Sequence, residues 1–341
     1  MSPRLDKRER VEAALAGRPV DRVPVSAWSH LLPAERKTDD LARATLKWFQ
    51  DYDWDWIKVN PRATLFAEGF GARFDLNTYY GVLPRLTAPT RPFALEDLKP
   101  ADPGRGAWAE HVDLLATLKK TLGGAPFVQT LFSPASTLGF LVGRPTATTQ
   151  QGVADNHAQT LLTLIRTQPR VVHQALDLIT TGLEKLARTS VEAGADGIFF
   201  AITKLAREGA LTTTEFEEFG KPYDLRVLKA VEGSKFNILH LCGPKVHWKQ
   251  AIDYPVRALN WASVGQGNPS VSEARNSSNL ALIGGVDEVG VIQTGSPSEV
   301  EVAAKKALEL GSRKFLLAPG CCVEPDVPVE NLRALRRAVG D

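Results

Sequence analysis

Short apolar runs alternate with longer amphipathic segments along almost the whole chain of 341 residues. Runs rich in branched and aromatic residues are typical of buried strands, whereas apolar residues three and four apart are typical of amphipathic helices. Prolines begin and glycines end several of the helical segments, as they often do at helix termini. The pattern predicts eight strands, at residues 21–28, 54–60, 126–132, 196–202, 235–241, 258–262, 281–286 and 314–318. Helices are expected at residues 4–16, 38–51, 107–122, 147–166, 169–193, 214–232, 245–253, 297–310 and 328–339.

Strands that alternate with helices form parallel sheets, and eight such units favour a closed (β/α)8 barrel over an open sheet. The chain has neither a glycine-rich Rossmann turn after its first predicted strand nor a phosphate-loop motif. Residues 65–105, which hold much Gly, Pro, Thr and Tyr, are expected to form an insertion with a hairpin near residues 79–81. No internal repeat or linker interrupts the pattern, so we expect a single domain over residues 1–341.

The composition narrows the class of protein. Charged residues make up 23% of the chain, hydrophobic residues 43%, and the formal net charge is +2, as in an ordinary soluble globular protein. No dense Lys/Arg cluster indicates a nucleic-acid partner, and no apolar run approaches the roughly 18–20 residues that cross a bilayer. The charged first ten residues lack the apolar segment of a secretory signal, so a cytoplasmic location is expected.

The three cysteines are too few for a disulfide framework, and reduced thiols are available to a metal. Side chains two apart in a strand point to the same side, so His240 and Cys242 project together from the fifth predicted strand. They supply half of a zinc site, and a cysteine after the eighth strand would complete a three-ligand set with an open fourth position, as in catalytic zinc sites. Thiolates select zinc over magnesium or calcium, and the metal would hold a bound thiol as a thiolate nucleophile. Ordinary core packing is the alternative, because free cysteines are often buried.

Geometry alone does not show which of the two cysteines after the eighth predicted strand would be the third ligand. Cys321 and Cys322 cannot both point at a metal if the chain is extended, but Gly320 permits an unusual turn.

Barrel enzymes carry their chemistry at the carboxyl ends of the strands. Asn60, Asn260 and Asp287 stand at or near such ends and are expected to line a cavity there. Asp287 fits either a site carboxylate or a helix cap.

Several stretches resemble those of the uroporphyrinogen decarboxylase superfamily, over nearly the whole length of the chain. They are residues 9–24, 193–197, 240–243, 284–287, 317–321 and 327–332. The resemblance implies a (β/α)8 barrel, which agrees with the strand count.

True decarboxylases of this superfamily need no cofactor and grip the carboxylates of a porphyrinogen with N-terminal arginines. When Leu32 and Pro33 are set on the family's Leu-Pro pair, Ser26 and His30 stand where those arginines belong. Residues 60–62 hold no carboxylate where the family has an Asp. Loss of two arginines weakens recognition of a polycarboxylate, so we keep uroporphyrinogen decarboxylase as an alternative function only.

The other arm of the superfamily, the zinc-dependent corrinoid methyltransferases, is marked by His-x-Cys and a distant Gly-Cys. By that match His240, Cys242 and Cys321 are the zinc ligands and Cys322 is not. The resemblance implies methyl transfer between a corrinoid (cobalamin), usually on a separate carrier protein, and a small-molecule thiol or similar acceptor. In this hypothesis Asp287 is the candidate catalytic residue, while Asn60, Arg62 and Asn260 bind substrate, with Arg62 on an anionic tail of the acceptor.

A non-catalytic barrel that binds a corrinoid or a carrier protein is a third hypothesis. Related barrels often dimerise, so a homodimer is also an expectation.

Overall fold

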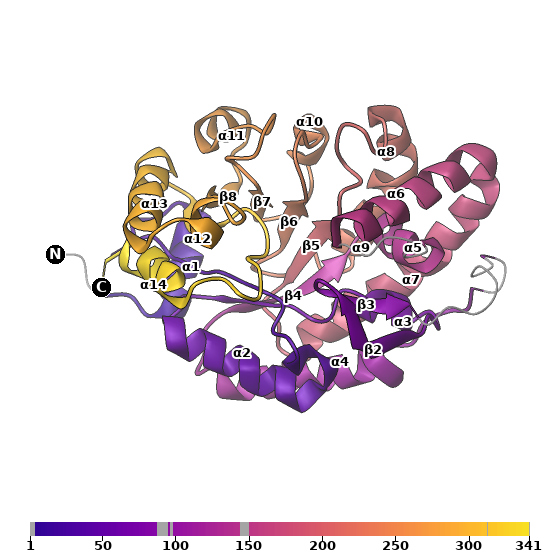
Figure 1. Cartoon of the computed structure of the whole chain (residues 1–341), viewed down its shortest axis with the longest axis horizontal. Helices are drawn as coiled ribbons and strands as arrows, with labels where there is room; N and C mark the ends of the chain where they lie inside the picture. Colours follow the sequence, from indigo (N-terminus) through magenta and orange to yellow (C-terminus); the bar gives the residue numbers. More distant parts are fainter. Residues whose placement is uncertain (1–3, 87–94, 96–97, 144–149, 312, 341) are drawn as a thin grey trace.

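The computed structural model describes residues 4–86, 95, 98–143, 150–311 and 313–340. Seven of its strands form one parallel sheet in the order β1–β4–β5–β6–β7–β8–β9. Figure 1 shows these strands in the middle of the molecule with helices around them. The strands are β1 (Ile57–Val59), β4 (Phe127–Phe132), β5 (Ile198–Ile202), β6 (Ile238–Leu241), β7 (Ala258–Trp261), β8 (Ala281–Val286) and β9 (Phe315–Pro319).

The helices follow the predicted alternation, with local differences. The helix expected at residues 214–232 is split at Gly220, because Pro222 stands in the first turn of a new helix. The helix expected at 245–253 covers one turn only, and the start of the one expected at 147–166 lies outside the described residues. The helices are α1 (Lys7–Ala16), the 3-10 turn η1 (Ala34–Arg36), α2 (Thr38–Tyr52), α3 (Leu65–Glu68), α4 (Gly106–Thr121), α5 (Pro134–Val142), α6 (Gln150–Thr167), α7 (Pro169–Glu192), α8 (Thr213–Phe219), α9 (Lys221–Lys229), α10 (Trp248–Ala251), α11 (Val271–Ser277), α12 (Val291–Thr294), α13 (Pro297–Gly311) and α14 (Val329–Arg337).

The eighth position of the barrel is filled by an irregular extended segment in place of a regular strand. Residues 24–29 lie between β9 and β1, where Val25 pairs in parallel with Leu317. The Leu317 amide donates to the Pro24 carbonyl (2.9 Å), and the Asp55 amide donates to the Val25 carbonyl (2.9 Å). Because Pro24 has no N–H to donate, it interrupts the ladder of the strand predicted at 21–28. The expected (β/α)8 architecture is thus present, with one strand reduced to isolated bridges.

Alternate residues of the strands belong to two different apolar clusters. The larger cluster holds Phe200, Leu239 and Leu259 together with apolar side chains of the surrounding helices. The smaller cluster fills the barrel interior with the intervening residues, such as Phe199, Ile238, Ala258, Ile283 and Leu316. His240 and Asn260 come two residues after Ile238 and Ala258, so they continue the inward-facing rows toward the carboxyl ends of the strands. The interior is therefore apolar below and polar at the mouth.

The hairpin expected near residues 79–81 is present between α3 and α4. Strands β2 (Phe74–Tyr80) and β3 (Leu83–Leu86) pair antiparallel, and Gly81 takes a positive φ of 59° in the turn. Along the described chain, no helix combines the length and the apolarity that a membrane span requires.

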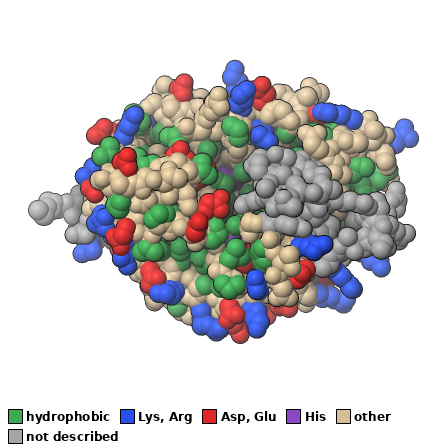
Figure 2. Space-filling view, viewed as in Figure 1, with side chains coloured by type: hydrophobic (Ala, Val, Ile, Leu, Met, Phe, Trp, Pro, Cys, Tyr) green, Lys and Arg blue, Asp and Glu red, His purple; other side chains and the backbone are tan. Residues whose placement is uncertain are grey.

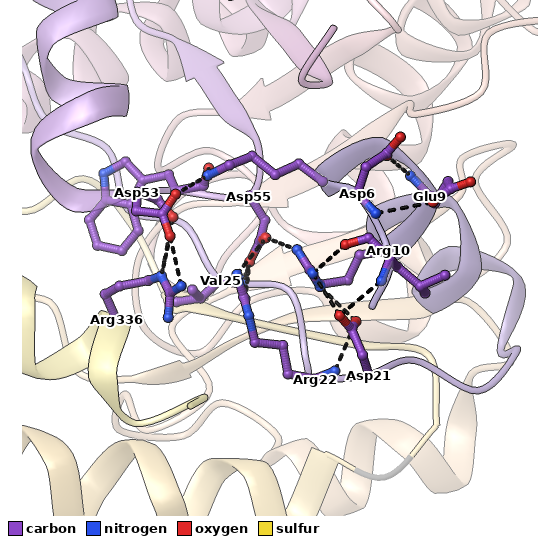
Figure 3. A network of polar contacts seen from close by, with 12 residues as sticks. Asp6, Glu9, Arg10, Asp21, Arg22, Val25, Asp53, Asp55 and Arg336 are labelled. Carbon is purple, nitrogen blue, oxygen red and sulfur yellow. Dashed lines mark hydrogen bonds and ion pairs between the residues drawn. The ribbon is translucent and has the colours of Figure 1, made fainter. Parts of the chain in front are cut away.

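A buried ion-pair network holds the irregular segment against β1 (Figure 3). Asp55, which has no exposed surface, accepts hydrogen bonds from Arg10 (2.7 Å), from Arg22 (2.6 and 3.1 Å) and from the Val25 amide (2.8 Å). Asp21 binds the other side of the Arg10 guanidinium and, by this hydrogen bond, raises the pKa of Arg10. One carboxylate thus joins α1, the segment that closes the barrel and the residues before β1.

We predict that Asp55→Asn lowers the free energy of unfolding by about 3–5 kcal/mol, because it leaves the buried Arg22 guanidinium without its counter-charge, while Arg10 keeps only Asp21. Urea denaturation followed by circular dichroism measures this change. Asp51→Asn is the matched control: Asp51 pairs with Lys47 on the exposed face of α2, and loss of such a pair costs about 0.5 kcal/mol or less. Equal stability of the two variants would contradict the role given to Asp55.

Candidate functional site

Three metal-binding side chains meet at the mouth of the barrel. His240 stands near the end of β6, Cys242 follows that strand, and Cys321 follows β9. One ligand atom from each lies within 4.8 Å of the others, and His240 Nε2 is 3.6 Å from Cys321 Sγ. This set of one imidazole and two thiols suits zinc and leaves room for a fourth ligand.

The end of β6 keeps His240 and Cys242 on one side. The Cys242 amide donates to the Ile202 carbonyl (3.2 Å), which extends the pairing of β6 with β5 by one residue. Side chains two apart in such an extended chain point the same way. Gly243, with a φ of 104°, then turns the chain immediately after Cys242.

Gly320 positions Cys321 by a close approach to β7. A Cβ atom on Gly320 would lie 2.4 Å from the Ala262 Cα and 2.9 Å from the Trp261 carbonyl oxygen, so only glycine fits. The Gly320 amide donates to the Val286 carbonyl (3.3 Å) and to a Glu288 carboxylate oxygen (3.2 Å). The chain after β9 is thereby held across the mouth, with Cys321 beside His240.

Cys322 lies in a different environment from Cys321. Its Sγ is 3.8 Å from Asn60 Nδ2 and 4.0 Å from Lys58 Nζ, so it faces side chains of β1 and the residue after it. It is not part of the three-residue cluster. Of the two cysteines that sequence geometry left open, the fold thus places Cys321, and not Cys322, beside His240 and Cys242.

Asn260, which pairs with His240 across β6 and β7, fixes the tautomer of that ring. The Asn260 amide nitrogen donates to the carbonyls of Ile283 (3.0 Å) and Pro319 (3.3 Å), so its Oδ1 is the acceptor that faces the imidazole. His240 Nδ1, 2.6 Å from that oxygen, carries the proton and donates it. The Nε2 lone pair is then free for a metal, as in many sites where the second ring nitrogen is held by a hydrogen bond.

The three thiols differ in acidity. The hydrogen bond with Cys321 lowers the pKa of Cys242 from its ordinary value, and the same contact raises the pKa of Cys321. A hydrogen bond to Cys321 and burial raise the pKa of Cys322 well above the ordinary value. Cys242 is thus the first to become a thiolate, the form that binds metals.

The cluster forms part of the wall of a cavity of about 830 Å³. Near the centre of Figure 2, purple histidine atoms are visible in the depth between the surrounding side chains. Concave, mostly apolar sites with a few polar groups are typical of small-molecule binding. The aromatic lining residues are Trp28, Phe132, Phe140 and Phe199, and the polar ones near the cluster include Lys58, Asn60, His240, Cys242, Glu288, Cys321 and Cys322.

Some of the residues expected at the site lie elsewhere. Asn60 lines the cavity, but Arg62, Asn260 and Asp287 lie outside its lining as the described residues define it. Arg62 forms a two-point ion pair with Glu68 (2.7 and 2.5 Å). Asp287 accepts hydrogen bonds from the backbone amides of residues 289 and 290 (3.1 and 3.0 Å), which shapes the turn after β8.

Lys58 and Glu288 are among the charged residues of the cavity that were not assigned a role from the sequence. Lys58 precedes Asn60 by two positions, and the period of a strand would have placed both on one face. Glu288, next to Asp287, lines the cavity, and burial raises the pKa of its carboxyl group.

The fold and the site define a (β/α)8 barrel with a partly buried His–Cys–Cys cluster in its mouth. The family model described as uroporphyrinogen decarboxylase (URO-D) matches residues 6–341, and the chain belongs to this family.

Several relatives found by sequence comparison are named as methyltransferases. Another, from Rhodococcus jostii, is named as a uroporphyrinogen decarboxylase and is 27% identical over 217 residues, which are 58% of this chain and 57% of that protein. The methylcobamide:CoM methyltransferase MtbA of Methanosarcina acetivorans is 30% identical over 171 residues, which are 50% of this chain and 49% of that protein. The match thus spans about half the length of that relative. The methylcobamide:CoM methyltransferase MtaA of Methanosarcina barkeri is 23% identical over 351 residues, with 96% of each chain covered. A solved methyltransferase from Methanosarcina mazei has a TM-score of 0.80 at 24% identity, with 98% of each chain covered, and therefore shares the fold.

We predict that Asn260→Ala weakens zinc binding about 10- to 100-fold, because the imidazole loses the acceptor that fixes its tautomer. Competition with a coloured zinc chelator measures the affinity, and circular dichroism checks that the variant is folded. Asn276→Ala, on the exposed side of α11, is the matched control and leaves the affinity unchanged. Wild-type affinity in folded Asn260→Ala would show that the hydrogen bond does not support the metal.

Proposed function

We propose that this protein is a zinc-dependent methyltransferase that moves a methyl group between a corrinoid and a thiol or similar acceptor. The observation that carries the proposal is the cluster of His240, Cys242 and Cys321 in the wall of a cavity large enough for a small molecule. The printed names of MtbA and MtaA, which refer to a methylcobamide and to CoM, support the reaction class.

In this proposal the three ligands hold the metal and leave its fourth position open to the cavity. Zinc bound there would keep the acceptor thiol in its thiolate form at neutral pH, ready to attack a methyl group. Asn260 orients His240 from behind, and the aromatic walls hold the acceptor away from water. Asp287 acts as a positioning residue, because its turn presents Glu288 to the cavity.

The methyl group would arrive from a corrinoid on a separate carrier protein that meets the mouth of the barrel. We further propose that residues 1–341 form one domain, with residues 65–105 as an insertion.

The decarboxylase alternative is disfavoured by the residues at the corresponding positions. Ser26 is fully buried, and its hydroxyl donates to the Trp56 carbonyl (2.7 Å), so it presents nothing to a ligand. Asn60 supplies an amide where the family's decarboxylases have a carboxylate. Release of CO₂ from uroporphyrinogen, without dependence on a metal, would instead support the decarboxylase.

We predict that the purified chain, after incubation with zinc, holds an equimolar amount of the metal by mass spectrometry. With methylcobalamin as the donor, it should methylate thiols, which the loss of methyl–cobalt absorbance reports. Zinc content well below equimolar would overturn the proposal. Bound zinc with corrinoid binding but no methyl transfer to any thiol would favour a non-catalytic corrinoid-binding barrel.

Two cysteine variants distinguish a proposed zinc ligand from a cysteine that only lies beside the cluster. Cys242→Ser is expected to lose both zinc and methyl transfer, because a serine hydroxyl remains protonated and binds zinc poorly. Cys322→Ser, the matched control at an equally buried thiol, should retain the metal. Loss of zinc from Cys322→Ser and retention by Cys321→Ser would reverse the assignment of the two neighbouring cysteines.

A further inference from the structure

We propose that Lys58 forms a subsite for the negatively charged group of the acceptor and so selects acceptors by charge. This inference rests on the proposed function, in which the acceptor binds at the His–Cys–Cys cluster. It concerns a residue of β1, on the side of the cavity where Cys322 lies.

Lys58 is an ammonium group inside the barrel mouth. The residue is only 7% exposed, and it lines the cavity together with Asn60. Its Nζ lies 4.8 Å from the centre of the Phe199 ring and 5.9 Å from that of Trp28. These ring faces attract a cation weakly but cannot neutralise its charge.

The polar partners of Lys58 are all uncharged. Its Nζ donates to Asn60 Oδ1, and the Sγ of Cys322 lies 4.0 Å away. The Asn60 amide is oriented for this contact, since its nitrogen donates to the Ser29 carbonyl (3.2 Å). Within the described part of the chain, Lys58 takes part in no ion pair with a carboxylate.

An ammonium buried in this way is costly unless an anion compensates it. Removing a charge from water costs several kcal/mol, and an amide oxygen with two aromatic faces offsets only part of that. Burial accordingly lowers the pKa of Lys58, while the nearby cysteines act in the opposite direction. The ammonium carries three donors: Asn60 accepts from one of them, and the Sγ of Cys322 is a weak acceptor for a second at 4.0 Å. The third donor, and the one that only the thiol accepts, are suited to the oxygens of a carboxylate or sulfonate.

Arg62 and His30 are less suited to this role. Arg62, the residue expected from the sequence to bind an anionic tail, is already engaged by both oxygens of Glu68. His30 lines the cavity, but its Nδ1 already pairs with the Glu35 carboxylate at 2.8 Å. Lys58 is the cation whose position beside Cys322 is fixed in the depth of the site.

The position of Lys58 also limits the size of the acceptor. Cys322, 4.0 Å from Lys58 Nζ, is the direct neighbour of Cys321 in the cluster. A thiol whose sulfur occupies the open position of the cluster would therefore place an anionic group, only a few bonds away, at Lys58. The subsite fits a short thiol that carries a carboxylate or sulfonate, in preference to a neutral or amino thiol of equal length.

Thiol binding to the cobalt(II)-substituted protein tests this proposal without turnover, because a bound thiolate gives a visible charge-transfer band. The probes are 3-mercaptopropionate, 2-mercaptoethanesulfonate, 2-mercaptoethanol and cysteamine. We expect the wild-type protein to bind the two anionic thiols about 10- to 100-fold more tightly than 2-mercaptoethanol, and cysteamine most weakly, since a hydrogen bond to a charged group is a strong one.

Lys58→Met keeps the length of the side chain and removes its charge. It should abolish the preference for anionic thiols while binding of 2-mercaptoethanol and the content of metal stay the same. Lys58→Arg should keep part of the preference, and Lys120→Met on the exposed end of α4 should keep all of it. Equal binding of all four thiols by the wild-type protein, or an undiminished preference in Lys58→Met, would overturn the subsite.

The test of the Lys58 subsite can be decided independently of the test of the proposed function. If the protein binds metal but transfers no methyl group, the thiol titrations still decide the role of Lys58. If it binds no metal, calorimetric titration of 3-mercaptopropionate into wild-type and Lys58→Met protein decides it, and equal affinities overturn it. Lys58→Gln replaces Lys58→Met if circular dichroism shows that the latter does not fold.

Discussion

Closure of the barrel between β9 and β1 depends on the Asp55 carboxylate. The segment that fills this gap makes only isolated bridges, because a proline interrupts its ladder. Asp55 replaces the missing pairing with hydrogen bonds to Arg10, Arg22 and the backbone at Val25. The site depends on this closure, since it brings the end of β9, with both cysteines, next to the Lys58 and Asn60 side chains of the β1 region.

Within the closed barrel, the two-residue period of the strands decides which side chains face the interior. The inward rows are filled by apolar residues until the last positions of β6 and β7, where His240 and Asn260 stand side by side. His240 and the residue that fixes its tautomer therefore come from adjacent strands in register. Such a pair needs no flexible loop, and its geometry is as rigid as the sheet itself.

The sequence predicted those parts of the site that follow from regular strands. The shared direction of His240 and Cys242 needs only a period of two, and the alternation of strands and helices leads to the barrel. Other features depend on local contacts that no pattern reveals. Arg62 and Asp287 are the right types of residue at strand ends, but Glu68 and a backbone turn engage them. Lys58 was overlooked although it precedes Asn60 by two positions, a spacing that places both side chains on one face of a strand.

The two adjacent cysteines show how narrowly the chain after β9 is constrained. On one side Gly320 is pressed against Ala262 with no space for a side chain. On the other side Val323 is bound by the backbone of Trp28 and by the Ser29 hydroxyl (3.0 and 2.9 Å). A slip of one residue between these two fixed points would exchange Cys321 and Cys322, so that Cys322 would join the cluster with His240 and Cys242 and Cys321 would face Lys58 and Asn60. Which cysteine lies beside His240 is thus a matter of register, fixed by two contacts that involve neither cysteine side chain.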